Sequence, residues 1–572
     1  MTKAFYVKDK DIIRLTNLSP ELQTALDGKL RYNEVLGCFE LPAEHYNLVD
    51  RPDIIKSSSL QEFLSIKQLS IPDEKHWNSL VKKVTLRPFQ VEFLKWLEAR
   101  RQLSYPPKGT QKGVCAQLTM GTGKTLLGVV TDHHLRKIGF IKKTLIICRQ
   151  NNKYSSWVAH LEKHSRVPFV VIEGDKRKRL KAIEEFRKKY DIAVIHYEGM
   201  RLHGTDLAGL PDFVILDEAQ AISNASSLQS KVADKITEKA KYILLLSGGI
   251  AQNKIAVQLY HGLHLLDRKV FPSFWKWREE WCTTEDIYVP LIIKGKRIIN
   301  KQTRTPVLRK ATQIVGIKDP EKLAAAISPY IYQLTKEDIK DQLPPITFQV
   351  IETELYPEQR ELYRKIRDEV AVLIKGLSVS NSLTKLIRLN QVCATLACLG
   401  MKDVSKKADD AVELILELPD EKALIFSQFV EMANSVYKRL IAKGAKALLL
   451  TGKTPKKERD VIKEKFRNDS TYQFLVSTIA LEGTGSDFAV ASYEYRLDRV
   501  YPPLVNDQVA SRVHRLTSPK PVTIIDFVTK KTIEEVQLKI LAEKLEDMRD
   551  VLVPAAQYTQ EDINRLLQPK GV

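Results

Sequence analysis

The chain has 572 residues, of which 44% are apolar and 28% are charged, with 90 lysines and arginines against 70 acidic residues. This composition excludes a collagen-like or largely disordered chain, and no apolar run reaches the roughly 18 residues that a membrane span needs. The net charge of +20 favours a polyanionic partner, but it does not distinguish DNA, RNA and a charged membrane surface.

Residues 1–80 predict a small α+β accessory module whose charge differs from that of the rest. They hold ten basic and twelve acidic residues, so the positive charge belongs to residues 81–572. Short β-prone runs at Ala4–Val7 and Val35–Leu41 are accompanied by turn signals such as Asp27-Gly28. The charged N-terminus argues against a secretory signal, and six cysteines without a Cys-x-x-Cys pair predict neither disulfides nor a zinc site. We therefore expect a cytoplasmic protein, or a nuclear one if its source is eukaryotic.

From residue 81 onward, apolar runs of strand length alternate with charged helical stretches. This alternation predicts parallel sheets with right-handed crossovers, hence an α/β fold. We expect one lobe at 81–254, a mostly helical insertion at 255–400, a second lobe at 401–545 and a helical tail at 546–572. The runs that predict the strands are Thr144–Cys148, Ala193–His196, Phe213–Leu216, Tyr242–Leu246, Ala423–Phe426, Ala447–Leu450, Phe474–Ser477, Arg496–Val500 and Val522–Phe527.

A glycine-rich motif, Thr119-Met120-Gly121-Thr122-Gly123-Lys124-Thr125, stands between an apolar run and a helix-prone stretch. Gly121 and Gly123 allow the backbone to curl, so that the N–H groups of this loop, including that of Thr122, point at phosphate oxygens. We expect Lys124 to neutralise the β- and γ-phosphates and Thr125 to bind Mg²⁺ through its hydroxyl. The motif therefore predicts a site for a nucleoside triphosphate. The alternative, a glycine-rich turn with an accidental Lys-Thr pair, explains the context less well.

The apolar run Phe213–Leu216 is followed directly by Asp217 and Glu218. A carboxylate at the C-terminal tip of a parallel strand beside a phosphate loop is well placed to bind Mg²⁺. We expect Asp217 to hold the ion, directly or through water, and Glu218 to orient and deprotonate the attacking water. An Asp-Glu pair on its own is ordinary surface chemistry, so this assignment depends on the phosphate loop.

Residues 287–318 contain eight basic side chains and no acidic one. The runs Tyr288–Ile293 and Arg297–Lys301 flank Lys294-Gly295-Lys296, which predicts a hairpin with alternating apolar and basic positions. Such a positive ribbon is suited to following a phosphate backbone, although a solvated surface hairpin explains the pattern equally well. The candidate nucleic-acid contacts are Lys294, Lys296, Arg297, Lys301 and Arg304.

An aromatic cluster in the expected insertion recurs at helical spacing. This spacing favours a role in the core of the insertion over base stacking. The cluster consists of Phe271, Phe274, Trp275, Trp277 and Trp281.

Near the end of the second expected lobe, the stretch from Gln508 to Arg515 places Arg512 and Arg515 three residues apart, on one face of a helix. A pair of arginines that reaches across a cleft stabilises the charge on a departing phosphoryl group, which contributes roughly 10³–10⁵ in rate in other systems. An isolated Arg-x-x-Arg is usually a solvated basic face. The functional interpretation therefore requires that the two lobes face each other.

The order of these motifs resembles that of superfamily 2 helicases, and among them the Swi/Snf-type DNA translocases, over about residues 81–540. The resemblance implies two RecA-like lobes that grip duplex or branched DNA and use ATP with Mg²⁺ to step along it. It implies that Gln90 reads the adenine edge and that Gln508, Arg512 and Arg515 join Lys124, Asp217 and Glu218 in catalysis. Further matching segments are Thr85–Gln90, Asp217–Asn224, Leu343–Pro345, Leu355–Tyr363, Leu383–Cys393, Lys422–Phe429 and Lys520–Glu534, and residues 1–80 resemble modules of annealing-helicase relatives from Gly28 to Pro42.

Three segments depart from the family pattern. Ser247-Gly248-Gly249-Ile250 lacks the usual Thr and Pro, Glu482–Phe488 introduces acidic residues, and Leu516-Thr517-Ser518 replaces Ile-Gly-Gln. The sequence leaves two alternatives open, an RNA-directed superfamily 2 helicase and a DNA-binding scaffold with a weak ATPase. It identifies no protein partner, and it predicts no membrane partner.

Overall fold

The structure is a computed structural model that describes residues 3–7, 12–16, 31–33, 38–42, 55–56, 69–105, 109–119, 121–150, 152–248, 255–290, 292–293, 296–297, 308–373, 379–418, 421–478, 488–499, 510, 512–515 and 518–550. Contacts between Cα atoms divide the chain into two units, Met1–Leu80 with Thr85–Lys112, and Val81–Val84 with Gly113–Val572. The first unit thus extends beyond residue 80, where we expected the accessory module to end. Among the described helices, none combines the length and apolarity needed to cross a bilayer.

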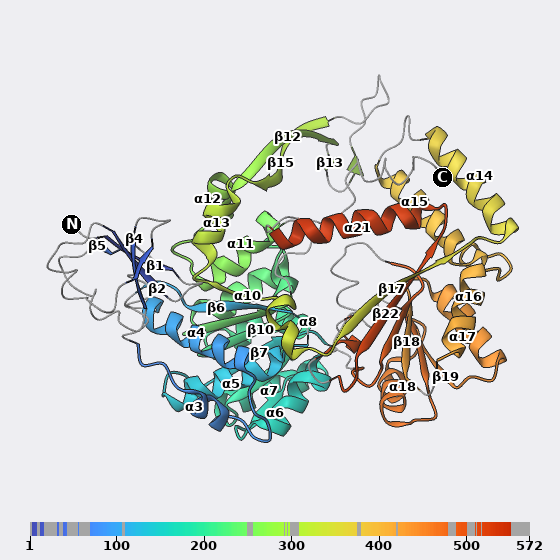
Figure 1. The fold of residues 1–572 in the computed structure, drawn as a ribbon. Helices are drawn as coiled ribbons and strands as arrows, with labels where there is room; N and C mark the ends of the chain where they lie inside the picture. The colour runs from blue at the N-terminus through green and yellow to red at the C-terminus, as the bar shows by residue number, and fades with distance from the viewer. Residues whose placement is uncertain are drawn as a thin grey trace. The chain divides into compact units, whose positions relative to one another are not determined.

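Among the described residues, the first unit contains a five-stranded sheet and the helices α3 and α4 (Figure 1). Its strands are ordered β3-β4-β2-β1-β5, and all pairs are antiparallel except β1 with β5. This agrees with the α+β composition expected of residues 1–80. The elements are β1 (Lys3–Val7), β2 (Ile12–Thr16), β3 (Arg31–Asn33), β4 (Cys38–Pro42), β5 (Ile55–Lys56), α3 (Glu74–Ser79) and α4 (Pro88–Ser104).

The second unit contains two parallel sheets, as the alternating pattern predicted. The first sheet has seven strands in the order β16-β6-β11-β10-β7-β9-β8. Its central strands are fully buried apolar runs because helices cover both faces. The strands are β6 (Gly113–Leu118), β7 (Thr144–Cys148), β8 (Phe169–Val171), β9 (Ile192–His196), β10 (Phe213–Asp217), β11 (Tyr242–Ser247) and β16 (Ile331–Leu334). The connecting helices are α5 (Lys124–Lys137), the π-helical turn η3 (Lys153–Val158), α6 (Ala159–His164), α7 (Lys176–Lys188), α8 (Tyr197–Leu202), α9 (Gly204–Leu207), η4 (Ala219–Ile222) and α10 (Leu228–Glu238).

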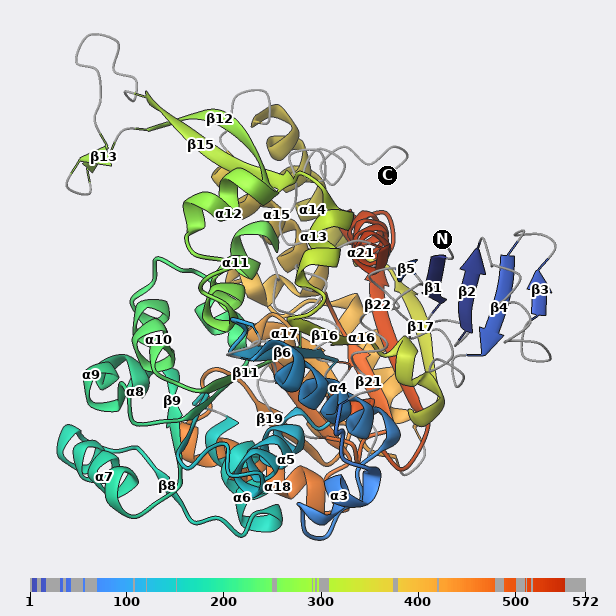
Figure 2. The same cartoon turned by 90° about the vertical axis from the view of Figure 1, so that its left-hand side faces the viewer.

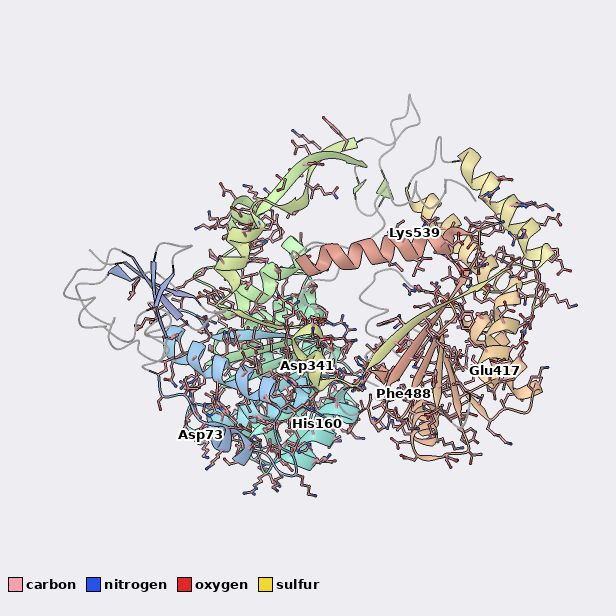
Figure 3. The ribbon with its side chains drawn as sticks, in the orientation of Figure 1. Asp73, His160, Asp341, Glu417, Phe488 and Lys539 are labelled. Atoms are coloured by element: carbon pink, nitrogen blue, oxygen red, sulfur yellow. The ribbon has the colours of Figure 1, made fainter. Side chains whose placement is uncertain are left out.

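The second sheet has six strands in the order β17-β22-β21-β18-β20-β19, also all parallel. Separate apolar cores lie on its two faces; Phe488, labelled in Figure 3, belongs to one of them and packs edge-on against Phe466. The strands are β17 (Ile346–Thr353), β18 (Ala423–Ser427), β19 (Ala447–Leu450), β20 (Phe474–Thr478), β21 (Tyr493–Arg496) and β22 (Val522–Thr529). The helices are α16 (Lys406–Leu416), α17 (Val430–Ala442), α18 (Lys456–Asn468) and α21 (Ile533–Asp550). The tail expected at 546–572 lies outside the described residues beyond Asp550.

The segment at 255–400 is mixed rather than simply helical. It supplies β16 to the first sheet and β17 to the second, and it carries a long two-stranded ribbon, β12 (Cys282–Pro290) with β15 (Leu308–Ile317), that runs away from α12 (Figure 2). We expected mostly helices there besides the hairpin at 287–318, and β16, with only four residues, is too short to leave a periodic signal. The helices are α11 (Ile255–Leu266), α12 (Phe274–Trp281), α13 (Pro320–Ile327), η5 (Glu337–Gln342), α14 (Pro357–Leu373), α15 (Val379–Ala394) and η6 (Leu396–Leu399).

Candidate nucleotide-binding and catalytic site

The glycine-rich loop joins β6 to α5, as the sequence predicted. Gly121 and Gly123 have φ angles of +83° and +81°, in the left-handed region where a Cβ atom is unfavourable. The hydroxyl of Thr122 donates to the carbonyl of Thr119 at 2.7 Å, which braces the loop from inside. The side chain of Thr122 thus keeps the loop in shape, and the contact of its backbone N–H with a phosphate stays a prediction.

Lys124 is the first residue of α5, and its amine turns back on the loop. Its Nζ donates to the carbonyls of Leu118 at 2.9 Å and Thr119 at 3.4 Å. Desolvation lowers the pKa of Lys124, and the nearby charges of Glu218 and Asp217 oppose that shift. An amine held by neutral carbonyls can exchange them for phosphate oxygens at little cost.

Asp217 ends β10 and is almost completely buried. Its Oδ2 accepts hydrogen bonds from the indole Nε1 of Trp157 at 3.0 Å and the amide of Asn152 at 3.4 Å. Burial, reinforced by the charge of Glu218, raises the pKa of Asp217 to about 6. The carboxylate thus carries a charge that burial disfavours and that a cation would stabilise.

The next residue, Glu218, has a left-handed backbone with φ +53°, a rare conformation for a residue with a Cβ atom. Its Oε2 accepts a hydrogen bond from the amide of Gln220, whose Oε1 accepts one from the hydroxyl of Ser247 at 2.9 Å. Glu218 is thereby connected to the end of β11. Ser247 opens the segment Ser247–Ile250, which lacks the Thr and Pro that are usual in the family. The hydrogen bonds from Glu218 to this segment run through Gln220 to Ser247, so they do not need that Thr and Pro.

Arg512 and Arg515, from the segment preceding β22, lie near the phosphate loop of the first sheet. A Cβ atom built on Gly121 would lie 3.3 Å from Cγ of Arg515. The charges of both arginines also act to lower the pKa of Lys124. The structure therefore brings together the Lys124, Asp217 and Glu218 group and the two arginines that the sequence assigned to the other lobe.

The structure does not test the roles of two other predicted site residues, Gln90 and Gln508. Gln90 belongs to the first unit, where its side chain accepts a hydrogen bond from the backbone N–H of Arg87 at 3.0 Å, so its contact with adenine stays a prediction. Gln508 lies outside the described residues, as do Gly249-Ile250 and Glu482–Asp487.

The basic ribbon differs from the predicted hairpin. Ile292 pairs with Arg297, as the predicted hairpin requires, and Ile293 pairs with Lys296; residues 294 and 295 lie outside the described residues. However, Tyr288 pairs with Lys310 rather than with a residue of the run Arg297–Lys301. Lys310 in turn forms an ion pair with Asp286 at 2.8 Å.

The roles of the ribbon's basic residues stay predictions. Lys294, Lys301 and Arg304 lie outside the described residues. Only the backbone positions of Lys296 and Arg297 are described, in β14 (Lys296–Arg297) opposite β13 (Ile292–Ile293).

The aromatic cluster behaves mostly as expected. Phe271, Trp277 and Trp281 are buried in the core of the first sheet's lobe, and Phe274 packs against it. Trp275 was wrongly assigned to the core: it is 68% exposed, and the guanidinium of Arg278 lies 4.3 Å from its ring centroid.

The residues at this site suit Mg²⁺. Thr125 and Asp217 offer the oxygen ligands that this ion prefers, and Oδ1 of Asp217 receives no hydrogen bond from any described residue. Mg²⁺ usually binds through one or two protein ligands together with substrate phosphates. It therefore does not require the cluster of three or more His, Cys, Asp or Glu side chains, and no such cluster occurs among the described residues.

Sequence reasoning missed the residues that support this site. These residues come from the stretch after β7 and from the strands beside it, where parallel strands present their carboxyl ends together. The position after β7 was the one available signal, because a polar stretch there faces the same edge as Asp217. They are Asn152, Ser156, Trp157, Tyr197, Gln220 and Ser247.

Several known proteins are similar in sequence to this chain. An uncharacterized ATP-dependent helicase of Mycoplasma pneumoniae is 25% identical over 505 residues, which cover 85% of this chain and 44% of the relative. A putative ATP-dependent helicase/translocase of Bacillus subtilis is 25% identical over 504 residues, or 84% of this chain and 50% of the relative. The human SWI/SNF-related matrix-associated actin-dependent regulator of chromatin subfamily A member 1 is 25% identical over 487 residues, or 80% and 42%. The chain spans about half the length of the curated relatives it matches.

Among solved structures, the SWI2/SNF2 ATPase core of Sulfolobus solfataricus in complex with dsDNA is similar to this chain. It is 24% identical, with a TM-score of 0.37 over 85% of this chain and 97% of that chain. Two families match in succession: the SNF2-related domain at residues 89–397 and the helicase conserved C-terminal domain at residues 406–517. The first match covers more than half of the 572 residues and includes Lys124, Asp217 and Glu218; the second includes Arg512 and Arg515. This chain therefore belongs to the SNF2-related family, the Swi/Snf-type branch of the superfamily 2 helicases.

Proposed function

We propose that this chain is an ATP- and Mg²⁺-dependent translocase that steps along duplex or branched DNA, in fork remodelling, branch migration, recombination or repair. Two facts support DNA as the track: the family and the excess of basic residues. The buried thiols of Cys115, Cys148, Cys282 and Cys393 suit a reducing cytoplasm.

The observation that carries the proposal is the approach of Arg515 to Gly121. Arg515, which supplies the positive charge opposite a γ-phosphate, lies in the lobe of the second parallel sheet. The loop that binds the phosphates belongs to the lobe of the first sheet. Hydrolysis then requires the two lobes to be closed, and opening after hydrolysis resets them. Chemistry and movement are coupled in this way.

Each residue has a role in this proposal. The N–H groups of Gly121, Thr122 and Gly123, with the amine of Lys124, hold the phosphates. Glu218 orients and deprotonates the attacking water, and Arg512 and Arg515, with Gln508, stabilise the charge of the transition state. Thr125 and Asp217 would hold Mg²⁺, which when bound neutralises charge on the phosphoryl oxygens.

The experiment that tests the proposal is an ATPase panel with blunt duplex, forked, four-way-junction and single-stranded DNA, and single-stranded RNA. Duplex or branched DNA should stimulate turnover, and Lys124→Ala should lose turnover while it still binds DNA. DNA binding should weaken steeply as salt rises, because lysine and arginine contacts release counterions from the phosphates. Stimulation by RNA alone would indicate an RNA-directed helicase, and tight DNA binding without stimulated turnover would indicate a scaffold.

A further inference from the structure

The π-helical turn Lys153–Val158 contacts both of the proposed Mg²⁺ ligands. The hydroxyls of Ser156 and Thr125 are 2.7 Å apart, and the indole Nε1 of Trp157 donates to Oδ2 of Asp217 at 3.0 Å. Two consecutive side chains thus reach one ligand on α5 and one at the end of β10. Single π-helical turns are rare, and they occur frequently at functional sites.

The hydrogen-bonding capacities of these groups fit metal binding. A threonine hydroxyl that binds a cation through its oxygen must give its hydrogen to an acceptor, and the hydroxyl of Ser156, which can donate or accept, is within reach to serve as one for Thr125. An indole N–H only donates, so Trp157 occupies Oδ2 of Asp217 and leaves Oδ1 for another partner. The turn therefore leaves an oxygen lone pair on each proposed ligand.

The fold makes room for this arrangement at Gly128, in the middle of α5. A Cβ atom there would lie 2.6 Å from Cη2 of Trp157, a distance that would force the indole to move. Glycine inside a helix costs about 1 kcal/mol relative to alanine, so this position is unfavourable for α5 alone. The indole is fully buried at the place that Gly128 leaves open.

We propose that Ser156 and Trp157 are positioning residues for Mg²⁺: Ser156 orients the hydroxyl of Thr125, and Trp157 orients the carboxylate of Asp217, so that both face one cation. The inference rests on the part of the proposed function that concerns Mg²⁺ and nucleotide, and it does not depend on DNA or translocation. Positioning groups of this kind typically change metal affinity by about 10- to 100-fold when removed.

The test measures ADP binding to the full chain by calorimetry, with and without Mg²⁺, for Ser156→Ala and Trp157→Phe. Affinity without Mg²⁺ should stay unchanged, and the gain in affinity that Mg²⁺ provides should fall by about 10-fold or more. Ser155→Ala is the matched control, because Ser155 is the exposed neighbour and should leave that gain unchanged. Ser156→Thr retains a hydroxyl and should recover the gain.

Two further variants separate positioning from general damage. Gly128→Ala should displace the indole and reproduce the Trp157→Phe result without removing a polar group. Adding Ser156→Ala to Thr125→Ala should cause no further loss of the Mg²⁺-dependent gain, because Ser156 would act through Thr125. The proposal is overturned if Ser156→Ala and Trp157→Phe weaken ADP equally with and without Mg²⁺, or leave both affinities unchanged. If the parent chain binds ADP in a Mg²⁺-dependent way but DNA does not stimulate its ATP turnover, the proposed translocase function is contradicted. The positioning roles of Ser156 and Trp157 are not.

Discussion

Each parallel sheet of the second unit has a buried aspartate at or just beyond the carboxyl end of a strand, and the two aspartates differ in their hydrogen-bond partners. Burial raises the pKa of both Asp217 and Asp498 to about 6. In the second sheet, Oδ2 of Asp498 accepts from the hydroxyl of Ser427 at 2.5 Å and Oδ1 from the backbone N–H of Gln428 at 2.6 Å. In the first sheet, both described hydrogen bonds to the carboxylate of Asp217 reach Oδ2. A raised pKa therefore does not distinguish a proposed metal ligand from a structural carboxylate, whereas a carboxylate oxygen that accepts no hydrogen bond from a described residue fits the proposed ligand.

Two lysines show the same contrast. Lys124 is held by two neutral carbonyls. Lys407 is buried and donates to both carboxylate oxygens of Glu534, at 2.6 and 2.7 Å, and to the carbonyl of Leu497 at 3.0 Å. Lys407 has satisfied its donors within the protein, and Lys124 can exchange its partners for a ligand. The comparison predicts that Lys124 and Asp217, beside the first sheet, are needed for ATP hydrolysis, whereas Lys407 beside the second sheet stabilises the fold. Arg512 and Arg515 precede a strand of the second sheet but are expected to act in hydrolysis.

The largest effect should come from these two arginines. Replacing Arg515 with alanine should lower DNA-stimulated ATP turnover by roughly 10³- to 10⁵-fold, because the charge opposite the γ-phosphate is lost. Single-turnover hydrolysis at saturating DNA measures this. Lys520→Ala is the control, since Lys520 lies in the segment just before β22, is exposed and forms an ion pair with Glu421. A loss of less than about tenfold for Arg515→Ala would mean that Arg515 does not stabilise the transition state of hydrolysis.

The two lysines should separate stability from turnover. Lys407→Ala leaves the carboxylate of Glu534 buried without its cation, so it should destabilise the protein by about 3–5 kcal/mol in denaturant unfolding. Lys124→Ala should abolish turnover and leave the unfolding transition unchanged. The control is Lys406→Ala, which removes a partly exposed ion pair with Asp410 and should cost under about 1 kcal/mol. If Lys124→Ala destabilised the protein as much as Lys407→Ala, the prediction that Lys124 acts in turnover and Lys407 in stability would be contradicted.

Matched substitutions should also separate the two aspartates. Asp217→Asn keeps the shape but loses the charge proposed to hold Mg²⁺, so kcat/KM for ATP should fall by roughly 10²- to 10³-fold. Asp498→Asn keeps an acceptor for the N–H of Gln428, and turnover should stay within a few-fold of the parent. Steady-state ATPase assays across a Mg²⁺ titration measure both. Comparable losses for the two variants would contradict the proposal that Oδ1 of Asp217, which accepts no hydrogen bond from a described residue, holds Mg²⁺.

The sequence alone predicts the phosphate loop, the acidic motif and the parallel sheets, because these features depend on local backbone geometry and on the order of elements along the chain. The positive φ angles of Gly121 and Gly123 and the position of Asp217 at a strand end follow from motif spacing, and the two parallel sheets follow from alternating apolar runs. It could not predict β16 or the supporting pair Ser156 and Trp157. Strand β16 is a partly exposed edge strand of four residues, and the π-helical turn has no sequence period that separates it from an ordinary helix. The approach of Arg515 to Gly121 depends on tertiary packing, which a periodic pattern does not specify.

The smallest expected effect is a change in the pH dependence of stability at Asp498. Because the pKa of Asp498 is raised from 3.8 to about 6, the folded protein holds a proton that the unfolded chain releases between about pH 4 and pH 6. Its contribution to the free energy of unfolding therefore falls as pH rises through this window, by up to about 3 kcal/mol, and is constant above it. Asparagine does not titrate, so the stability of Asp498→Asn relative to the parent should increase from pH 4 to pH 7. Urea unfolding at a series of pH values measures this difference, and parallel curves would mean that the charge of Asp498 costs the fold nothing.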